Sequence, residues 1–160
     1  MPILEVEHLT IDYPTRKGTV RAVNDVSFSM EKGETLGLVG ESGCGKTMTA
    51  MSVLRLVPSP PGKIVAGSIM FQGRNLLELS DREMQAVRGR SMSIVFQDPM
   101  TYLNPVMRVG DQIAEVILRH QVVDREEAQR RMLEVLQMVR MPNPSSTIDC
   151  YPHVLSGGMR

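Results

Sequence analysis

The stretch Gly40-Glu41-Ser42-Gly43-Cys44-Gly45-Lys46-Thr47 matches the phosphate-loop pattern, in which a glycine is followed after four residues by Gly-Lys and a hydroxyl residue. Such a loop turns successive backbone N–H groups toward one point, where the N-terminus of the next helix adds a partial positive charge. We therefore expect phosphate oxygens to bind here. Lys46 would reach the β- and γ-phosphates of a nucleoside triphosphate, and the Thr47 hydroxyl would bind Mg²⁺.

The residues on either side of this loop predict a strand before it and a helix after it. Residues 35–39, Thr-Leu-Gly-Leu-Val, are a short apolar run typical of a buried parallel strand. Residues 47–56 have the length of a helix that ends before the proline-rich segment 58–62. This order predicts an α/β fold with a phosphate-loop NTPase core and a mostly parallel sheet.

Composition excludes several classes of protein. The 160 residues are 42% hydrophobic and 22% charged, which is enough for one domain with a core. Eighteen basic and eighteen acidic residues cancel, so neither general nucleic-acid affinity nor attraction to anionic lipid is expected. No apolar run approaches the roughly 18 residues of a membrane span, and no signal peptide is recognisable, which predicts a cytosolic chain. The cysteines, Cys44 and Cys150, form no C-x-x-C unit, so no disulfide framework or zinc site is expected.

Short strands are expected on both sides of the phosphate loop. Residues 3–9 alternate between apolar and acidic, with Leu4 and Val6 on one face and glutamates on the other, as in a half-buried antiparallel strand. Residues 19–30 continue in the same style after a turn at 13–18. The pattern further predicts a strand at 67–73, a short helix at 81–87 and an apolar strand at 93–96.

Amphipathic helices are expected from residue 109 onward. Asp111 can cap a first helix, and Asp124 with Glu127 forms a capping box for a second. The expected apolar side of the first helix consists of Ile113, Val116, Ile117 and His120. That of the second consists of Ala128, Met132, Val135, Leu136 and Val139. Arginines and glutamates share the rest of the second helix, which predicts a solvated face rather than a nucleic-acid patch.

The end of the apolar run 93–96 offers two candidates for a metal contact. An acidic residue often follows such a strand in phosphate-loop enzymes, and Asp98 could be that residue. Because Pro99 favours a turn that begins at Asp98, we instead expect Gln97 to contact the metal or the attacking water.

Two further positions have both a functional and a structural interpretation. Tyr13 could stack on a base, or it could simply pack at the edge of the sheet. Ser156 is a good N-cap, and Gly157-Gly158 would let an anion approach the backbone at the start of a helix. The same three residues could equally form a flexible turn.

Taken together, these pieces resemble the ATP-binding subunits of ABC transporters throughout the chain. The likeness is most specific at 96–105, Phe-Gln-Asp-Pro-Met-Thr-Tyr-Leu-Asn-Pro, and at 151–160, which are similar to the oligopeptide and dipeptide importer branch. The resemblance implies an N-terminal antiparallel β region at 1–33, a phosphate-loop core at 34–98, and a helical region at 99–160 that ends at the signature motif.

The resemblance also implies roles for single residues. Tyr13 would stack on adenine, Lys46 and Gln97 would be catalytic, and Thr47 and Gln97 would hold Mg²⁺. A second set would clamp the γ-phosphate of ATP bound to the opposite subunit: Ser156, Gly157 and Gly158. The implied nucleotide-binding residues are Tyr13, Gly40, Glu41, Ser42, Gly43, Cys44, Gly45, Lys46, Thr47, Met48 and Gln97.

The implied function is ATP-driven import of peptides or similar small solutes. The expected partners are a second ABC ATPase subunit, identical or similar, and integral membrane permease subunits at the cytoplasmic face of the membrane, without nucleic acid. An ABC-type ATPase acting on nucleic acid is the alternative, although such proteins insert coiled coils or zinc modules between the two motifs. The family's next strand, with its Mg²⁺-binding aspartate and catalytic glutamate, would follow Arg160. We therefore expect a fragment that binds nucleotide without turnover, and an intact protein that hydrolyses ATP.

Overall fold

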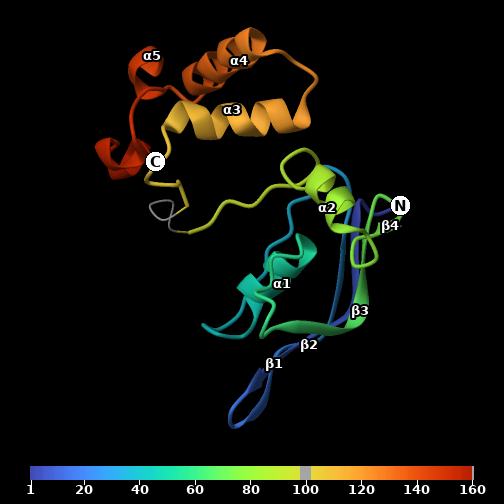
Figure 1. The fold of residues 1–160 in the computed structure, drawn as a ribbon. Helices are drawn as coiled ribbons and strands as arrows, with labels where there is room; N and C mark the ends of the chain where they lie inside the picture. Colours follow the sequence, from blue (N-terminus) through green and yellow to red (C-terminus); the bar gives the residue numbers. More distant parts are fainter. Residues whose placement is uncertain (98–101, 160) are drawn as a thin grey trace. The chain divides into compact units, whose positions relative to one another are not determined.

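In the computed structural model, an antiparallel sheet is the framework of the N-terminal half of the chain (Figure 1). The structure describes residues 1–97 and 102–159, which divide into two compact units, Met1–Arg88 and Gly89–Arg160. The sequence-based boundaries at residues 33 and 98 stay predictions.

The sheet of the first unit has four strands in the order β2-β1-β3-β4. The strands are β1 (Leu4–Thr15), β2 (Gly18–Met30), β3 (Lys63–Phe71) and β4 (Arg74–Asn75). As predicted, Leu4 and Val6 are buried, while Glu7 is exposed. The buried apolar residues of the sheet and the elements around it are Leu4, Val6, Leu9, Ile11, Val23, Val53, Leu54, Ile69, Phe71, Leu76 and Met84.

The β1–β2 connection is tighter than the sequence predicted. The expected turn at 13–18 shrinks to residues 16–17, because β1 runs on to Thr15 and β2 begins at Gly18. Pro14 is tolerated within β1 because the β1–β3 ladder stops at Asp12, so only β2 lies beside Pro14. The strand expected at 67–73 was also displaced: β3 spans Lys63–Phe71, and residues 72–73 form the turn into β4.

A β-bulge at His8 changes the phase of burial along β1. Strict alternation would place Leu9 on the face opposite Val6, yet both are buried. His8 has a φ of 50°, and the register of β1 shifts between Val6 and Leu9. Opposite it, Asp25 of β2 has a φ of 53°, and the His8 Nδ1 and Asp25 Oδ1 atoms lie 2.7 Å apart. This hydrogen bond raises the pKa of His8 above its ordinary value of 6.5.

The third strand at the bulge carries a glycine where only a glycine fits. Gly67 of β3 has a φ of 98°, a conformation that other residues rarely adopt. A Cβ atom at this position would lie 2.5 Å from the carbonyl oxygen of Glu7. The bulge therefore depends both on the left-handed conformation of His8 in β1 and on the absence of a side chain at Gly67 in β3.

Two short helices belong to the first unit. Helix α1 (Lys46–Val53) is shorter than the predicted 47–56, because Arg55 adopts a left-handed φ of 50°. The Arg55 N–H donates to Ser52 O and the Leu56 N–H to Met51 O, a Schellman arrangement that ends the helix. Helix α2 (Asp81–Val87) has the predicted bounds, and Ser80 begins it with a complete capping box.

The second unit is helical. Its described residues form α3 (Val109–His120), α4 (Arg125–Met138), α5 (Pro144–Thr147) and the 3₁₀ turns η2 (Pro152–Val154) and η3 (Gly157–Met159). Its core consists of Ile117, Ala128, Met132 and Leu136, with Ile113, Val123, Met141 and Ile148 packed against them. Asp124 caps α4 as predicted, with its carboxylate accepting from the Glu127 N–H at 2.8 Å. The predicted capping box is not completed, because the Glu127 carboxylate accepts from Arg130 and Arg131 instead.

Several helix predictions were wrong in detail. Val116, Val135 and Val139 are exposed rather than part of the core, because the contact between α3 and α4 uses a narrower stripe than the sequence pattern offers. Asp111 does not cap α3, which begins one turn earlier than expected with Arg108 as its N-cap. None of the helices in the described part of the chain has both the length and the apolar character needed to cross a bilayer.

Two predicted strands are not formed. Residues 35–39 and 93–96 carry no strand assignment, and Leu36, Leu38 and Val39 are exposed. A strand needs hydrogen-bonding neighbours, and none of the described segments pairs with either run. The described sheet is therefore antiparallel throughout, and the parallel part of the predicted sheet is not among its pairings.

Candidate functional site

The phosphate-loop segment lies in the first unit, where it leads from an exposed stretch into α1. Gly45 is the N-cap of α1 and has a φ of 97°. A Cβ atom on Gly45 would collide with the carbonyl oxygen of Ala22 in β2 and would contact Val23, which is buried. The glycine therefore allows the start of α1 to pack directly on the backbone of β2, which fixes the position of the loop.

The start of α1 presents unpaired backbone donors. The first intrahelical bond is that of the Thr49 N–H to Gly45 O, at 2.8 Å. No hydrogen bond to any described residue is made by the N–H groups of residues 45–48, and no side chain caps the helix. Unpaired N–H groups at a helix start attract anions, because they add to the positive end of the helix dipole. The geometry thus fits a phosphate group.

The Lys46 side chain folds back over the loop. Its Nζ atom donates to Gly40 O at 2.8 Å and to Glu41 O at 2.6 Å, and lies 3.5 Å from Cys44 Sγ. Among the described residues, no carboxylate forms an ion pair with this ammonium group. No ion pair with a described residue therefore neutralises the charge of Lys46, and a bound anion could do so.

Tyr13 of β1 reaches the same helix. Its hydroxyl group donates to the Met48 Sδ atom at 3.1 Å, and both side chains are partly buried. The structure thus brings Tyr13 to the first turn of α1, next to the loop residues 40–48, although 35 positions separate Tyr13 from Met48 in the sequence. This placement agrees with a site in which an aromatic ring and a phosphate loop contact the same ligand.

The fit of a divalent cation depends here on one protein oxygen. Thr47 is exposed at the start of α1, and its hydroxyl group has no hydrogen-bond partner among the described residues. No cluster of three or more His, Cys, Asp or Glu side chains is found in the part of the chain that the structure describes. The residues therefore suit a Mg²⁺ ion that is held mainly by phosphate oxygens and only in part by the protein.

The other predicted site residues belong to the second unit, so their relation to Lys46 stays a prediction. Gln97 is exposed, and beside it the rings of Phe96 and Tyr102 stack with centroids 4.1 Å apart. Ser156 precedes the 3₁₀ turn η3, and its carbonyl oxygen accepts from the Met159 N–H at 2.9 Å. Asp98, the alternative to Gln97, lies outside the described residues.

Directly after Ser156, residues Gly157–Met159 form the 3₁₀ turn η3. Its two glycines, Gly157 and Gly158, are exposed. A Cβ atom at Gly158 would meet nothing within 4 Å. The turn therefore leaves its backbone open to approach from outside, as a contact with a ligand of another subunit would need.

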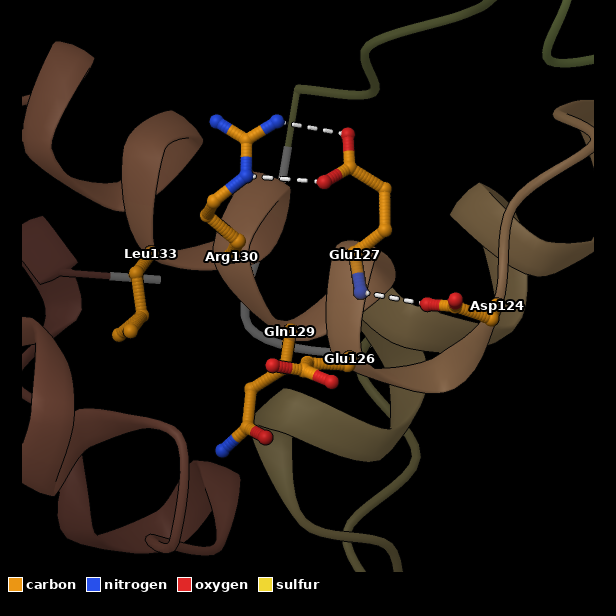
Figure 2. A pocket seen from close by; sticks show the side chains of 6 residues that line it. All are labelled: Asp124, Glu126, Glu127, Gln129, Arg130 and Leu133. Atoms are coloured by element: carbon orange, nitrogen blue, oxygen red, sulfur yellow. Dashed lines mark hydrogen bonds and ion pairs between the residues drawn. The ribbon is translucent and has the colours of Figure 1, made fainter.

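A shallow hollow on α4 has a different character from the loop (Figure 2). Its lining residues are Asp124, Glu126, Glu127, Gln129, Arg130 and Leu133. The Arg130 guanidinium group forms a two-pronged ion pair with Glu127, at 2.7 and 2.8 Å (Figure 2). Hydrogen bonds from Arg131 and Arg130 lower the pKa of the Glu127 carboxyl group. The charges of Glu127 and Arg130 neutralise each other, and the hollow lies on the solvated face of α4 that the sequence predicted.

Sequence reasoning missed the contacts that give the loop its setting. The carbonyl oxygens of Gly40, Glu41 and Ala22 have no signature in the sequence, because every residue has one. Gly62, which lies against the Tyr13 ring, was noted only as part of a breaker segment. Because the strand was expected to begin at residue 67 and not at Lys63, the sequence offered no signal that Gly62 would lie beside β1.

Comparisons with known proteins give consistent results. The model of the family described as "ABC transporter" matches residues 23–160. The chain is 47% identical over 158 residues to the oligopeptide transport ATP-binding protein OppD of Bacillus subtilis, and 46% identical to the dipeptide transport ATP-binding protein DppD of the same organism. These matches cover 99% of this chain but 44% and 47% of the two relatives. The chain therefore spans about half the length of the curated relatives it matches.

A solved structure shows the same fold. The dimeric structure of MJ0796, a bacterial ABC transporter cassette, matches with a TM-score of 0.81 and 23% sequence identity. The match covers 98% of this chain and 64% of that chain. This likeness confirms the predicted fold class, although part of the expected sheet is not formed here.

Proposed function

This chain belongs to the ABC transporter family, and from that premise we propose that it is the nucleotide-binding part of an ATP-hydrolysing subunit that drives import of peptides or similar small solutes. The observation that carries the proposal is the start of α1, where unpaired N–H groups and the uncompensated Lys46 ammonium group face the same loop. The names of the curated relatives, which are oligopeptide and dipeptide transport ATP-binding proteins, support the substrate class.

Several residues would each contribute to holding ATP. The backbone N–H groups at the start of α1 would bind phosphate oxygens, and Lys46 would exchange its contacts with Gly40 O and Glu41 O for the β- and γ-phosphates. Tyr13 would stack on the adenine ring. A Mg²⁺ ion bound to Thr47 and Gln97 would neutralise phosphate charge.

The remaining contributions would come from assembly. Ser156, Gly157 and Gly158 would bind the γ-phosphate of ATP held by a second ATPase subunit, which is identical or similar to this one. This chain would bind integral membrane permease subunits at the cytoplasmic face of the membrane. Closing and reopening of the two ATPase subunits would move these permease subunits, which would carry the solute. Catalysis would depend mainly on positioning and charge neutralisation at the transferred phosphoryl group, for which Lys46 and Gln97 are the expected residues.

Loss of the Lys46 ammonium group tests the binding step. In the intact protein, Lys46→Ala should weaken Mg-ATP binding by roughly 1.5–3 kcal/mol, because it removes charge-assisted hydrogen bonds to the phosphates. Isothermal titration calorimetry measures the change. Lys32→Ala is the matched control, because it removes an exposed ammonium group from the same unit outside the loop. Equal affinities for the wild type and Lys46→Ala would contradict the proposed site.

A second experiment distinguishes peptide import from an ATPase that acts on nucleic acid. Cells that lack the intact protein should lose uptake of labelled dipeptides and oligopeptides, and the wild-type gene should restore uptake while Lys46→Ala should not. Unchanged uptake in the deletion strain would contradict the importer function. Stimulation of the ATPase activity by DNA would instead favour the nucleic-acid class.

A further inference from the structure

The Tyr13 ring lies against a glycine that no motif singles out. The β1–β3 ladder ends where Asp12 pairs with Lys63, so Gly62 falls beside Tyr13 at the open end of the ladder. A Cβ atom on Gly62 would lie 2.7 Å from Tyr13 Cζ and 2.9 Å from Tyr13 Cε1. Real Cβ atoms essentially never approach other heavy atoms this closely. Any residue other than glycine at 62 would therefore displace the ring or the backbone.

The backbone at Gly62 has little room to yield. The Gly62 N–H donates to Pro58 O at 2.8 Å, and a Cβ atom on Gly62 would also come within 2.8 Å of that oxygen. The next residue, Lys63, is already held in the sheet by its pairing with Asp12. A larger residue at 62 would therefore press on both the Pro58 carbonyl oxygen and the Tyr13 ring, and of these two the Tyr13 side chain is the one that can rotate away.

The opposite end of the Tyr13 side chain is held by Met48. The Tyr13 hydroxyl group donates to the Met48 Sδ atom, and Met48 is the residue after Thr47 in the first turn of α1. The ring is therefore held at its hydroxyl end by the helix, and Gly62 lies against its Cζ and Cε1 atoms. Together these contacts keep the ring beside the phosphate loop.

We propose that Gly62 is a positioning residue for base recognition: its missing side chain leaves the space in which the Tyr13 ring lies, oriented to stack on the purine of a bound nucleoside triphosphate. This inference rests on the proposed function. Gly62 contributes to the affinity for the base and not to the affinity for the phosphates, because its contact is with Tyr13 and not with the loop.

The test compares a ligand with a base and one without. In the intact protein, Gly62→Ala should lower the affinity for Mg-ATP about tenfold, as expected when a base loses an aromatic stacking partner. The affinity for inorganic tripolyphosphate with Mg²⁺ should not change, because that ligand has no base. Both are measured by calorimetry. An equal loss for the two ligands, or no loss for ATP, would overturn the proposal.

A double-mutant cycle shows whether Gly62 acts through Tyr13. Added to Tyr13→Ala, the substitution Gly62→Ala should cause no further loss of ATP affinity, since the ring it displaces is gone. A further loss of similar size would overturn the positioning role. If Tyr13→Ala itself leaves ATP affinity unchanged, base stacking at Tyr13 fails and this inference fails with it. If Tyr13→Ala weakens ATP binding and Gly62→Ala does not, only the positioning role fails.

A second variant keeps the test available if Gly62→Ala does not fold. Met48→Leu conserves volume and removes the sulfur acceptor of the Tyr13 hydroxyl group. It should lower ATP affinity several-fold relative to tripolyphosphate affinity. An unchanged ratio of the two affinities would contradict the idea that these contacts hold the ring for the base.

Discussion

Two apolar stretches of the first unit differ in burial. In β1, Leu9 and Ile11 are 0% exposed, whereas in the run 35–39 Leu38 is 43% and Val39 is 96% exposed. The difference lies in their neighbours: β1 has β2 on one side and β3 on the other, while no described segment pairs with residues 35–39. Apolar composition favours burial, but a strand forms only where another strand satisfies its backbone groups.

The start of α1 is held against the sheet although the run before the phosphate loop is not a strand. Gly45 packs on the Ala22 carbonyl oxygen of β2, and Lys46 holds the carbonyl oxygens of Gly40 and Glu41. The loop is thus shaped by the antiparallel sheet and by α1. The candidate site therefore depends on the paired strands rather than on the apolar run that identifies it in the sequence.

The largest expected effect is a difference in stability between substitutions in these two apolar stretches. In the 160-residue chain, Leu9→Ala should lower the free energy of unfolding by about 2–5 kcal/mol, because it leaves a cavity under the sheet. Leu38→Ala should change it by no more than about 0.5 kcal/mol, because Leu38 is already exposed. Urea unfolding followed by circular dichroism measures both. Similar losses for the two variants would show that residues 35–39 are packed in solution.

A smaller effect is expected where the loop meets β2. Gly45→Ala should cost about 1–3 kcal/mol in the free energy of unfolding, because its φ of 97° is strained for alanine and the new Cβ would meet Ala22 O. Gly37→Ala is the matched control, since a Cβ there meets nothing within 4 Å. Equal stability of Gly45→Ala and the wild type would break the claim that β2 fixes the loop.

The helical unit allows the same contrast between a partnered and an unpartnered residue. Asp124→Ala should cost about 1 kcal/mol, because the Asp124 carboxylate accepts the Glu127 N–H at the start of α4. Asp111→Ala should cost only about 0.3 kcal/mol, because Asp111 lies in the first turn of α3 without capping it. Thermal unfolding compares them, and a larger loss for Asp111→Ala would contradict the observed cap.

The smallest effect concerns the bulge that keeps Leu9 buried. Because Asp25 raises the pKa of His8, the ion pair stabilises the fold fully below the ordinary value of 6.5 and is lost as pH rises through the higher folded pKa. Glu7, the neighbouring carboxylate, acts in the same direction. Unfolding midpoints measured between pH 6 and 9 should therefore fall slightly. Asp25→Asn should flatten this dependence, and an unchanged slope would argue against the pair.

Much of the fold was predictable where the signal is local. The bounds of α2 and the cap of α4 at Asp124 followed from side chains that bond to backbone groups three residues away. Burial of Leu4 and Val6 followed from simple alternation. The exposed valines of α3 and α4 did not, because the width of a buried stripe depends on how closely the partner helix approaches.

The candidate site was predictable to the same extent. The residues 40–47 are contiguous, so their pattern is visible in the sequence. The contacts of Tyr13 with Met48 and Gly62 join segments that are 35 and 49 positions away from Tyr13, and no local pattern encodes them. Only pairing of β1 with β3 brings Gly62 to the Tyr13 ring.

By itself the sequence determined the phosphate loop, the helix caps and the family resemblance, because each depends on residue types at fixed short spacings. Tertiary structure alone decided which apolar runs become strands, where the bulge at His8 shifts the register, and which surfaces hold the Tyr13 ring. The physical reason is that backbone pairing and close packing are properties of two segments at once. The pattern of one segment indicates which of its residues can be buried, and whether they are buried depends on the segment that packs against it.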